Sequence, residues 1–184
     1  MGLAFLVVGC ATLKPVSKPV VVADSPGSIK AWSMDGRIGV QASERAWQAN
    51  LYWEHDPMQD RLRISGPLSQ GLVSIVVQKD LIFVNEGNGV TSLSRDPDSM
   101  LRQRLGFSVP LSSLRYWIMG IPDPASPSNR AHTDDRGDDF EQADWLVSTD
   151  EMVKVAGWML PRKLRVQGAG VKLKILADSW ELKD

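Results

Sequence analysis

The sequence predicts a mainly β protein of the α+β class, built on one curled antiparallel sheet with a few short helices. Two observations lead to this class. From Ile29 onward, apolar and polar residues alternate with a period of two, as in strands that bury one face. Short segments rich in Gly, Pro, Asn and Asp separate the alternating runs, as hairpin turns do. The runs amount to about nine to eleven strands, and a sheet of that size curls toward a barrel.

The alternation is clearest in three runs. Trp47, Leu51 and Trp53 fall on one face of an expected strand over 47–54, with polar residues between them. Leu62 and Ile64 alternate with polar residues in the run DRLRIS, and the run VKLKIL near the C-terminus repeats the pattern. These apolar residues are expected to form the buried face of the sheet.

Two stretches break the alternation and predict short amphipathic helices. In DPDSMLRQRLG, Asp96 is a suitable N-cap, Pro97 suits the first helical position, and Gly106 ends the helix. The stretch LSSLRYWIMG follows the same scheme and ends at Gly120. The apolar residues of the two expected helices include Leu101, Leu105, Leu114, Trp117 and Ile118.

The segment IPDPASPSNRAHTDDRG, residues 121–137, is expected to be a long loop, because it is too long and too rich in Pro and Asp for a tight turn. It runs into an acidic stretch, DDRGDDFE, whose carboxylates would suit a calcium ion. The spacing of these residues departs from that of an EF-hand loop. A solvated acidic loop is therefore the favoured interpretation.

Cys10 is the single cysteine of the chain, so no internal disulfide can form. It follows the apolar run LAFLVVG, which is too short to span a bilayer but suits the end of a signal peptide. The stretch VVGC matches a lipobox, in which the cysteine receives a diacylglycerol group. The alternative is an apolar N-terminal end with an incidental cysteine. Ala11, in place of Asp, favours the outer membrane under the sorting rule associated with enterobacterial lipoproteins.

These features predict three parts. Residues 1–9 are expected to be a signal peptide. Residues 10–27 hold the cysteine and several prolines, and are expected to form a flexible tether. Residues 28–184 are expected to form one domain, because a chain of 184 residues suffices for a single core.

Several kinds of function are disfavoured. A formal charge of −1 and a pI near 6.1 argue against a nucleic-acid partner, which requires clustered positive charge. His55 and His132, the two histidines, lie in separate expected turns or loops and suggest neither a catalytic pair nor a zinc site. Ser69 lacks the G-x-S-x-G context of a nucleophile, and no phosphate-binding loop is present. We expect a protein that is not an enzyme and has no cofactor.

The chain contains seven tryptophans, several of them on apolar strand faces. One interpretation is that their rings fill the core of a small barrel. The other is that a curled sheet of this length encloses more room than its side chains occupy, which leaves an apolar pocket. The sequence leaves both open.

Five motifs resemble those of one known family. They are DGRIGV at 35–40, LYW at 51–53, DRLRISGPLSQG at 60–71, LRYWIMGIP at 114–122 and VKLKILADSW at 171–180. Together with the lipobox, they make the chain similar to the outer-membrane lipoprotein receptor family LolB, whose fold is similar to that of the lipoprotein carrier LolA. The motif LRYWIMGIP and the C-terminal strand are the most specific of the five.

The resemblance implies an unclosed antiparallel barrel of about eleven strands, with a lid of short helices over an apolar cavity. The implied function is to accept lipoproteins from the periplasmic carrier LolA, to hold their acyl chains in the cavity and to insert them into the outer membrane. The partners would be LolA, lipoprotein cargo and outer-membrane phospholipid, and the protein would be a lipid-anchored monomer on the periplasmic face. The residues expected at the cavity and lid are Trp47, Leu51, Trp53, Leu62, Ile64, Leu101, Leu105, Leu114, Trp117 and Ile118.

Leu68 lies in the expected turn GPLSQG, where a protruding leucine has little to cover it. The resemblance implies that this residue touches the membrane during delivery. The alternative is that Leu68 folds back over the rim of the barrel. A different function also remains open, namely an outer-membrane scaffold or assembly lipoprotein with a packed core and no lipid binding; an enzyme acting on lipids is a more distant third.

Overall fold

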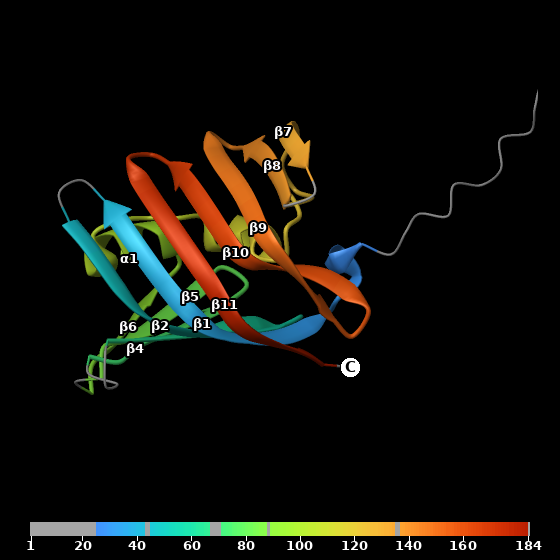
Figure 1. The fold of residues 1–184 in the computed structure, drawn as a ribbon. Coiled ribbons are helices and arrows are strands. Elements are labelled where there is room, and N and C mark those ends of the chain that lie inside the picture. The colour runs from blue at the N-terminus through green and yellow to red at the C-terminus, as the bar shows by residue number, and fades with distance from the viewer. Residues whose placement is uncertain (1–24, 43–44, 67–70, 88, 135–136, 184) are drawn as a thin grey trace, which may run out of the picture.

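The protein forms one antiparallel sheet of eleven strands in the order β6-β5-β4-β3-β2-β1-β11-β10-β9-β8-β7. The computed structural model describes residues 25–42, 45–66, 71–87, 89–134 and 137–183. The sheet curls strongly, and the two helices lie against its inner face (Figure 1). The expected fold class is thereby confirmed.

The elements follow one another along the chain with short connections. They are η1 (Pro26–Ser28), β1 (Ala31–Ala42), β2 (Arg45–Asp56), β3 (Gln59–Ser65), β4 (Val73–Gln78), β5 (Leu81–Asn85), β6 (Thr91–Ser94), α1 (Pro97–Leu105), α2 (Leu111–Trp117), β7 (Ser128–Asp134), β8 (Gly137–Gln142), β9 (Trp145–Val155), β10 (Trp158–Gly168) and β11 (Val171–Lys183). Except for β1 with β11, each pair of neighbouring strands is consecutive in sequence.

The sheet is not closed, because β6 and β7 form its two edges and do not pair with each other. The chain passes from one edge to the other through α1 and α2. This connection places both helices over the inner face of the sheet. The barrel is therefore sealed on this side by side chains of the helices rather than by strand hydrogen bonds.

A β-bulge lies between β1 and β11 at the centre of the sheet. Asp35 pairs with Ser179 and Gly36 pairs with Ala177, so the extra residue is Asp178 of β11. At Gly36 the neighbouring strand comes so close that an added Cβ would lie 2.1 Å from the carbonyl oxygen of Leu176. Glycine is required here because no side chain fits between the two backbones.

The predicted limits of α1 are confirmed. The side chain of Asp96 accepts a hydrogen bond from the backbone N–H of Ser99, with 3.0 Å between the heavy atoms, and Pro97 is the first helical residue. Gly106 ends the helix in the left-handed conformation, with φ of 81°. Local sequence therefore determines this helix, through a cap at each end.

The prediction of one long loop over 121–137 was wrong. Residues 128–134 form β7, which pairs with β8, and β8 itself starts at Gly137. Residues 128–131 are all exposed, so the strand shows no apolar alternation and is held by its backbone ladder to β8. The same pairing places His132 in a strand, and His55 lies in β2, which runs on to Asp56.

Candidate functional site

The inner face of the sheet and the two helices enclose an apolar cavity of about 40 Å³. Its walls come from strands β1 to β4 and β11, from both helices and from the segment between the helices. The lining residues are Ile38, Leu51, Trp53, Leu62, Ile64, Ile75, Leu101, Phe107, Val109, Leu111, Leu114, Leu173 and Ile175. We refer to this space as the inner cavity.

Six of the residues expected at the cavity and lid meet there. They are Leu51, Trp53, Leu62, Ile64, Leu101 and Leu114, and each is at most 8% exposed. The strand residues among them share one face through the period of two. The helix residues reach the same space from α1 and α2, which the sequence could not show.

Other expected residues lie elsewhere. Trp117 and Ile118 are buried but do not line the inner cavity, and Trp117 packs its ring against Trp145 with 6.2 Å between ring centroids. Trp47 is half-buried near the end of β1 and packs against Phe107. Three expectations fall outside the described part of the structure, namely Cys10, Leu68 and the side chain of Leu105.

The inner cavity is too small for a lipid chain as it stands. An apolar cavity of about 150 Å³ is needed to hold a molecule as small as benzene, and the inner cavity measures about 40 Å³. Its walls carry almost no polar atoms, so an apolar guest suits it better than a water molecule. An acyl chain can enter only if part of the wall moves.

One end of the inner cavity is closed by α2, which is tied to the sheet through a buried carboxylate. Asp60, at 3% exposure, accepts a hydrogen bond from the indole N–H of Trp53 at 3.0 Å. It also forms an ion pair with Arg115 of α2, whose Nη2 lies 3.0 Å from its Oδ2. Nδ1 of His55 lies 2.8 Å from Oδ1 of the same carboxylate. We call this group of four residues the Asp60 cluster.

A second buried network also holds α2. The indole N–H of Trp117 donates to the side-chain oxygen of Gln142 at 2.7 Å, and the side-chain amide of Gln142 donates to the carbonyl oxygen of Asp123 at 2.8 Å. The hydroxyl of Ser113 also donates to Asp123, at 2.8 Å. Moving α2 would break several buried polar contacts at once, each of which is costly to leave unmade.

The attachment of α1 is much weaker. Met100 and Leu101 are its buried side chains among those described. Its polar contacts to the sheet run from Arg104 to Glu86 at 3.0 Å and to Ser92 at 2.6 Å, all near the surface. Exposed pairs of this kind contribute about 0–1 kcal/mol. The contacts of the described residues hold α1 to the sheet less firmly than α2.

Phe107, in the segment between the helices, separates the inner cavity from the surface. It is 9% exposed and lines both the inner cavity and a surface groove of about 440 Å³. The groove is bordered by the end of α1 and by the turns at Ala143 and at Gly170. Displacing α1 together with Phe107 would connect the inner cavity to this surface groove, whose lining includes the polar residues Asp98, Arg102 and Ser108.

The sequence contained a signal for the Asp60 cluster that the sequence analysis missed. Asp60, Leu62 and Ile64 are spaced two apart, so Asp60 shares the inward face of β3. A charged residue with this spacing requires a buried partner. Its partner Arg115 comes from α2, and no local pattern connects the two.

Metal chemistry finds no support in the described residues, among which no group of three or more His, Cys, Asp or Glu side chains is placed to hold an ion. None of the helices in the described ranges combines the length and the apolar character needed to cross a bilayer. The features left to explain are a closed apolar interior and a weakly attached helix.

Comparison with known proteins identifies the family. The family model of the outer membrane lipoprotein LolB matches residues 30–180. The chain belongs to the LolB family. The match extends from just before β1 to Trp180 in β11, so it covers the sheet and both helices. LolB proteins are outer-membrane lipoproteins, and the resemblance seen in the sequence motifs is confirmed.

Individual LolB relatives are similar over nearly their whole length. The LolB of Thiobacillus denitrificans is 31% identical over 184 residues, which cover 98% of this chain and 94% of the relative. The LolB of a Marinomonas species is 26% identical over 180 residues, which cover 97% of this chain and 93% of the relative.

Solved structures share the fold at low sequence identity. A DUF1329 family protein from Desulfovibrio piger aligns with a TM-score of 0.53 and 8% identity, covering 86% of this chain and 88% of its own. A LolA superfamily protein from Nitrosomonas europaea aligns with a TM-score of 0.49 and 10% identity, covering 88% of this chain and 95% of its own.

Proposed function

We propose that this protein is the receptor that takes lipoproteins from the periplasmic carrier LolA, holds their acyl chains in the inner cavity and inserts them into the outer membrane. The observation that carries this proposal is the apolar inner cavity beneath a weakly attached helix. Membership of the LolB family supports it independently.

The energetics explain why such a protein is required. Each buried methylene group contributes about 0.8 kcal/mol, so a sixteen-carbon acyl chain resists transfer into water by roughly 12 kcal/mol. A lipoprotein therefore needs a dry apolar site at every stage between the carrier and the membrane. The residues that would contact the chains first are the cavity-lining residues of β2 and β3, Leu51, Trp53, Leu62 and Ile64.

We infer that loading begins with displacement of α1. As Leu101 and Phe107 leave the inner cavity, the acyl chain takes their place against the sheet, so apolar surface stays covered throughout. The fixed helix α2 and its Leu114 then form the floor of the opened cleft. No nucleotide is used, and the direction of transfer follows from tighter binding by the receptor than by the carrier, at about 1.4 kcal/mol per tenfold difference in affinity.

Attachment to the membrane would use Cys10, with the segment up to residue 27 as a tether on the periplasmic face of the outer membrane. Leu68 would touch the phospholipid during delivery. A single leucine contributes about 1.5–3 kcal/mol on burial, which suits brief contact followed by release. Near it in sequence, Leu72 is 41% exposed, so the apolar character of this loop extends into the described residues. The protein would act as a monomer.

The second candidate is an outer-membrane scaffold lipoprotein that binds no lipid. The small volume of the inner cavity favours it, because a packed interior suffices for a structural role. The two functions differ in one respect that can be measured. A receptor must open and take up an acyl chain, whereas a scaffold does not.

The test is binding of a fluorescent sixteen-carbon fatty acid to the purified protein. We expect saturable binding that Leu101→Glu weakens at least tenfold, because a charge would enter the apolar inner cavity. The matched control is Gln103→Glu, which adds the same charge on the exposed side of α1. If the folded wild-type protein binds no fatty acid, the scaffold function replaces the receptor function.

A further inference from the structure

The hairpin of β9 and β10 extends past the rest of the sheet, on the side of the molecule where η1 lies (Figure 1). β10 pairs with β11 only from Lys163 onward, and the pairing of β9 with β8 ends at Ser148. Beyond these points the two strands pair only with each other. We call residues 152–159 the hairpin tip.

The hairpin tip has a defined shape. Its strands are joined by a two-residue turn in which Ala156 and Gly157 both have positive φ, 47° and 93°. Such turns match the twist of a two-stranded ribbon and hold the strands in register. The side chains of the tip are therefore presented in fixed positions.

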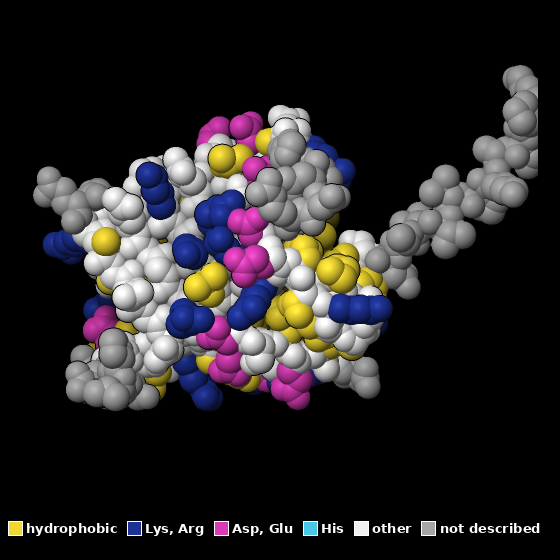
Figure 2. Space-filling view, viewed as in Figure 1, with side chains coloured by type: hydrophobic (Ala, Val, Ile, Leu, Met, Phe, Trp, Pro, Cys, Tyr) yellow, Lys and Arg dark blue, Asp and Glu magenta, His cyan; other side chains and the backbone are white. Residues whose placement is uncertain are grey.

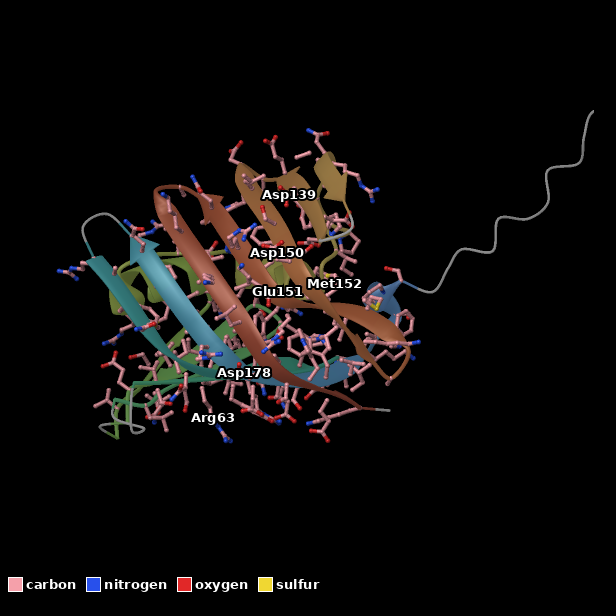
Figure 3. The ribbon with its side chains drawn as sticks, viewed as in Figure 1. Arg63, Asp139, Asp150, Glu151, Met152 and Asp178 are labelled. Atoms are coloured by element: carbon pink, nitrogen blue, oxygen red, sulfur yellow. The ribbon has the colours of Figure 1, made fainter. Side chains whose placement is uncertain are left out.

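Both faces of the hairpin tip are apolar. Val153, Val155 and Trp158 lie on one face, and Met152 and Met159 lie on the other. Val155 and Trp158 are half-buried and pack against the core of the domain. The exposed apolar side chains are Val153 on one face, at 37% exposure, and Met159 on the other, at 50%. Hydrophobic side chains gather over this part of the molecule in Figure 2, and Figure 3 places Met152 on the same side.

This pattern departs from that of a strand in water, where one face is polar. The core already covers Val155 and Trp158, so the apolar side chains left exposed are Val153 and Met159, one on each face. The boundary between lipid headgroups and acyl chains can contact the projecting end of a hairpin from both faces at once, so exposure on both faces favours a membrane over a protein partner.

The polar groups of the hairpin tip also suit a membrane surface. Lys154 is the one charged residue of the tip, and a long lysine side chain can reach phosphate groups while its backbone lies deeper. Trp158 belongs to the residue type that is enriched at the membrane–water interface. The tip thus combines apolar, aromatic and basic side chains as interfacial segments do.

The start of the described chain lies at the same place. β10 contacts η1, and roughly 15 residues separate η1 from Cys10, so a fully extended tether reaches at most about 50 Å. A lipid anchor at Cys10 would keep this end of the domain within that distance of the bilayer. The hairpin tip can therefore reach lipid while the protein is anchored.

We propose that the hairpin tip is a membrane-contacting surface that enters the headgroup region and the upper acyl region of the bilayer. The proposal rests on the membrane attachment proposed above, and it adds to the contact proposed for Leu68. Its role is to fix how the anchored domain is oriented on the membrane. The domain would then meet the bilayer in a constant orientation when it releases cargo.

The test compares two probes on the same strand. The lipidated full-length protein is placed in vesicles of phosphatidylethanolamine and phosphatidylglycerol, and an environment-sensitive fluorophore is attached to Val153→Cys or to Leu146→Cys. These two side chains have nearly equal exposure, 37% and 38%, at opposite ends of β9. We expect lipid-borne quenchers to reduce the emission at position 153 several-fold and to leave position 146 unchanged.

The other outcomes overturn the proposal. Equal emission from both probes, quenched or not, would show that the hairpin tip has no particular contact with lipid. If added carrier protein, without vesicles, changed the emission at position 153, the surface would belong to a protein partner instead. The measurement uses the receptor without cargo, so failure of fatty-acid binding would remove the proposed function and leave this result intact.

A second variant pair tests whether the contact matters. Val153→Asp with Met159→Asp is expected to abolish quenching of a fluorophore at residue 155, attached through Val155→Cys. Leu146→Asp is the control and is expected to leave that quenching unchanged. Thermal unfolding of each protein verifies that the hairpin remains folded. Undiminished quenching in the double variant would contradict the proposal.

Discussion

At the scale of single residues, Asp60 shows how a buried charge organises the site. Its carboxylate lies in the interior between Trp53, His55 and Arg115. A buried pair is costly to break, because the remaining charge is left without a partner. The position of α2 over the inner cavity therefore depends on an interaction between residues far apart in the sequence.

We expect Arg115→Met to lower the free energy of unfolding by about 3–5 kcal/mol, since it leaves the Asp60 carboxylate buried and unpaired. The measurement is urea denaturation at neutral pH. The control is Arg63→Met, because Arg63 is an exposed residue of the same strand as Asp60 and lies over the ring of Tyr52 at 5.5 Å. That change should cost about 1 kcal/mol or less. Equal losses in the two variants would contradict the role given to the Asp60 cluster.

Leu68 provides a prediction that concerns delivery alone. Leu68→Glu is expected to retain binding of the fluorescent fatty acid and to lose insertion of lipoprotein into vesicles, because a charged side chain is expelled from the acyl region of a bilayer. Leu68→Ile is the matched control and should retain both activities. Loss of both binding and insertion in Leu68→Glu would mean that Leu68 supports the folded domain and has no separate role in membrane contact.

At the scale of elements, the two helices differ in attachment although both cover the inner cavity. α2 is held by two sets of buried polar contacts, from Arg115 to Asp60 and from Trp117 to Gln142. α1 is fixed by two buried apolar side chains and by surface contacts of Arg104. The segment between the helices, which includes Phe107, is the natural place for the movement to be absorbed.

Hydrogen exchange tests this difference. We expect backbone amides of α1 to exchange well before those of α2 in the protein without ligand, because local opening follows the weakest packing. Addition of palmitate should change the exchange of α1 and leave that of α2 unchanged. Slower exchange in α1 than in α2 would contradict the proposal, because α2 would then be the helix that opens more readily.

At the scale of the whole molecule, one side-chain contact joins two central strands that are not neighbours in the sheet. Lys183, the last residue of β11, reaches over β1 to Glu54 of β2, with 2.6 Å between Nζ and Oε1. The hydrogen bond from Lys183 is the main reason that the pKa of Glu54 lies below its ordinary value of 4.5, and Arg61 adds to the effect. This ion pair connects the end of the chain to the centre of the sheet.

The ion pair predicts a direction for acid sensitivity. A carboxylate whose pKa is lowered by folding stabilises the protein above its unfolded pKa, and this contribution is lost as pH falls through the folded pKa. We expect Lys183→Met to raise the pKa of Glu54 and to flatten the loss of stability in acid. Urea denaturation at a series of pH values below 5, with Lys172→Met as an exposed control, measures this. An unchanged pH dependence in Lys183→Met would show that the ion pair does not contribute to the acid sensitivity.

Most of the strands, the two helices and the caps of α1 follow from sequence alone, because each depends on residues that are near one another in the chain. The period of two in β2 and β3 placed Leu51, Trp53, Leu62 and Ile64 on the buried face, and Asp96 marked the start of α1. The family could also be named from short motifs, because these carry the same local constraints.

Only the tertiary structure decided how the interior is closed. The pairing of Asp60 with Arg115, the strand β7 within an expected loop and the reduction of the inner cavity to about 40 Å³ each depend on how the sheet curls. Curling brings together residues whose separation in sequence carries no periodic signal. For the same reason, the sequence could not show which helix is held more firmly, since that distinction rests on contacts with distant strands.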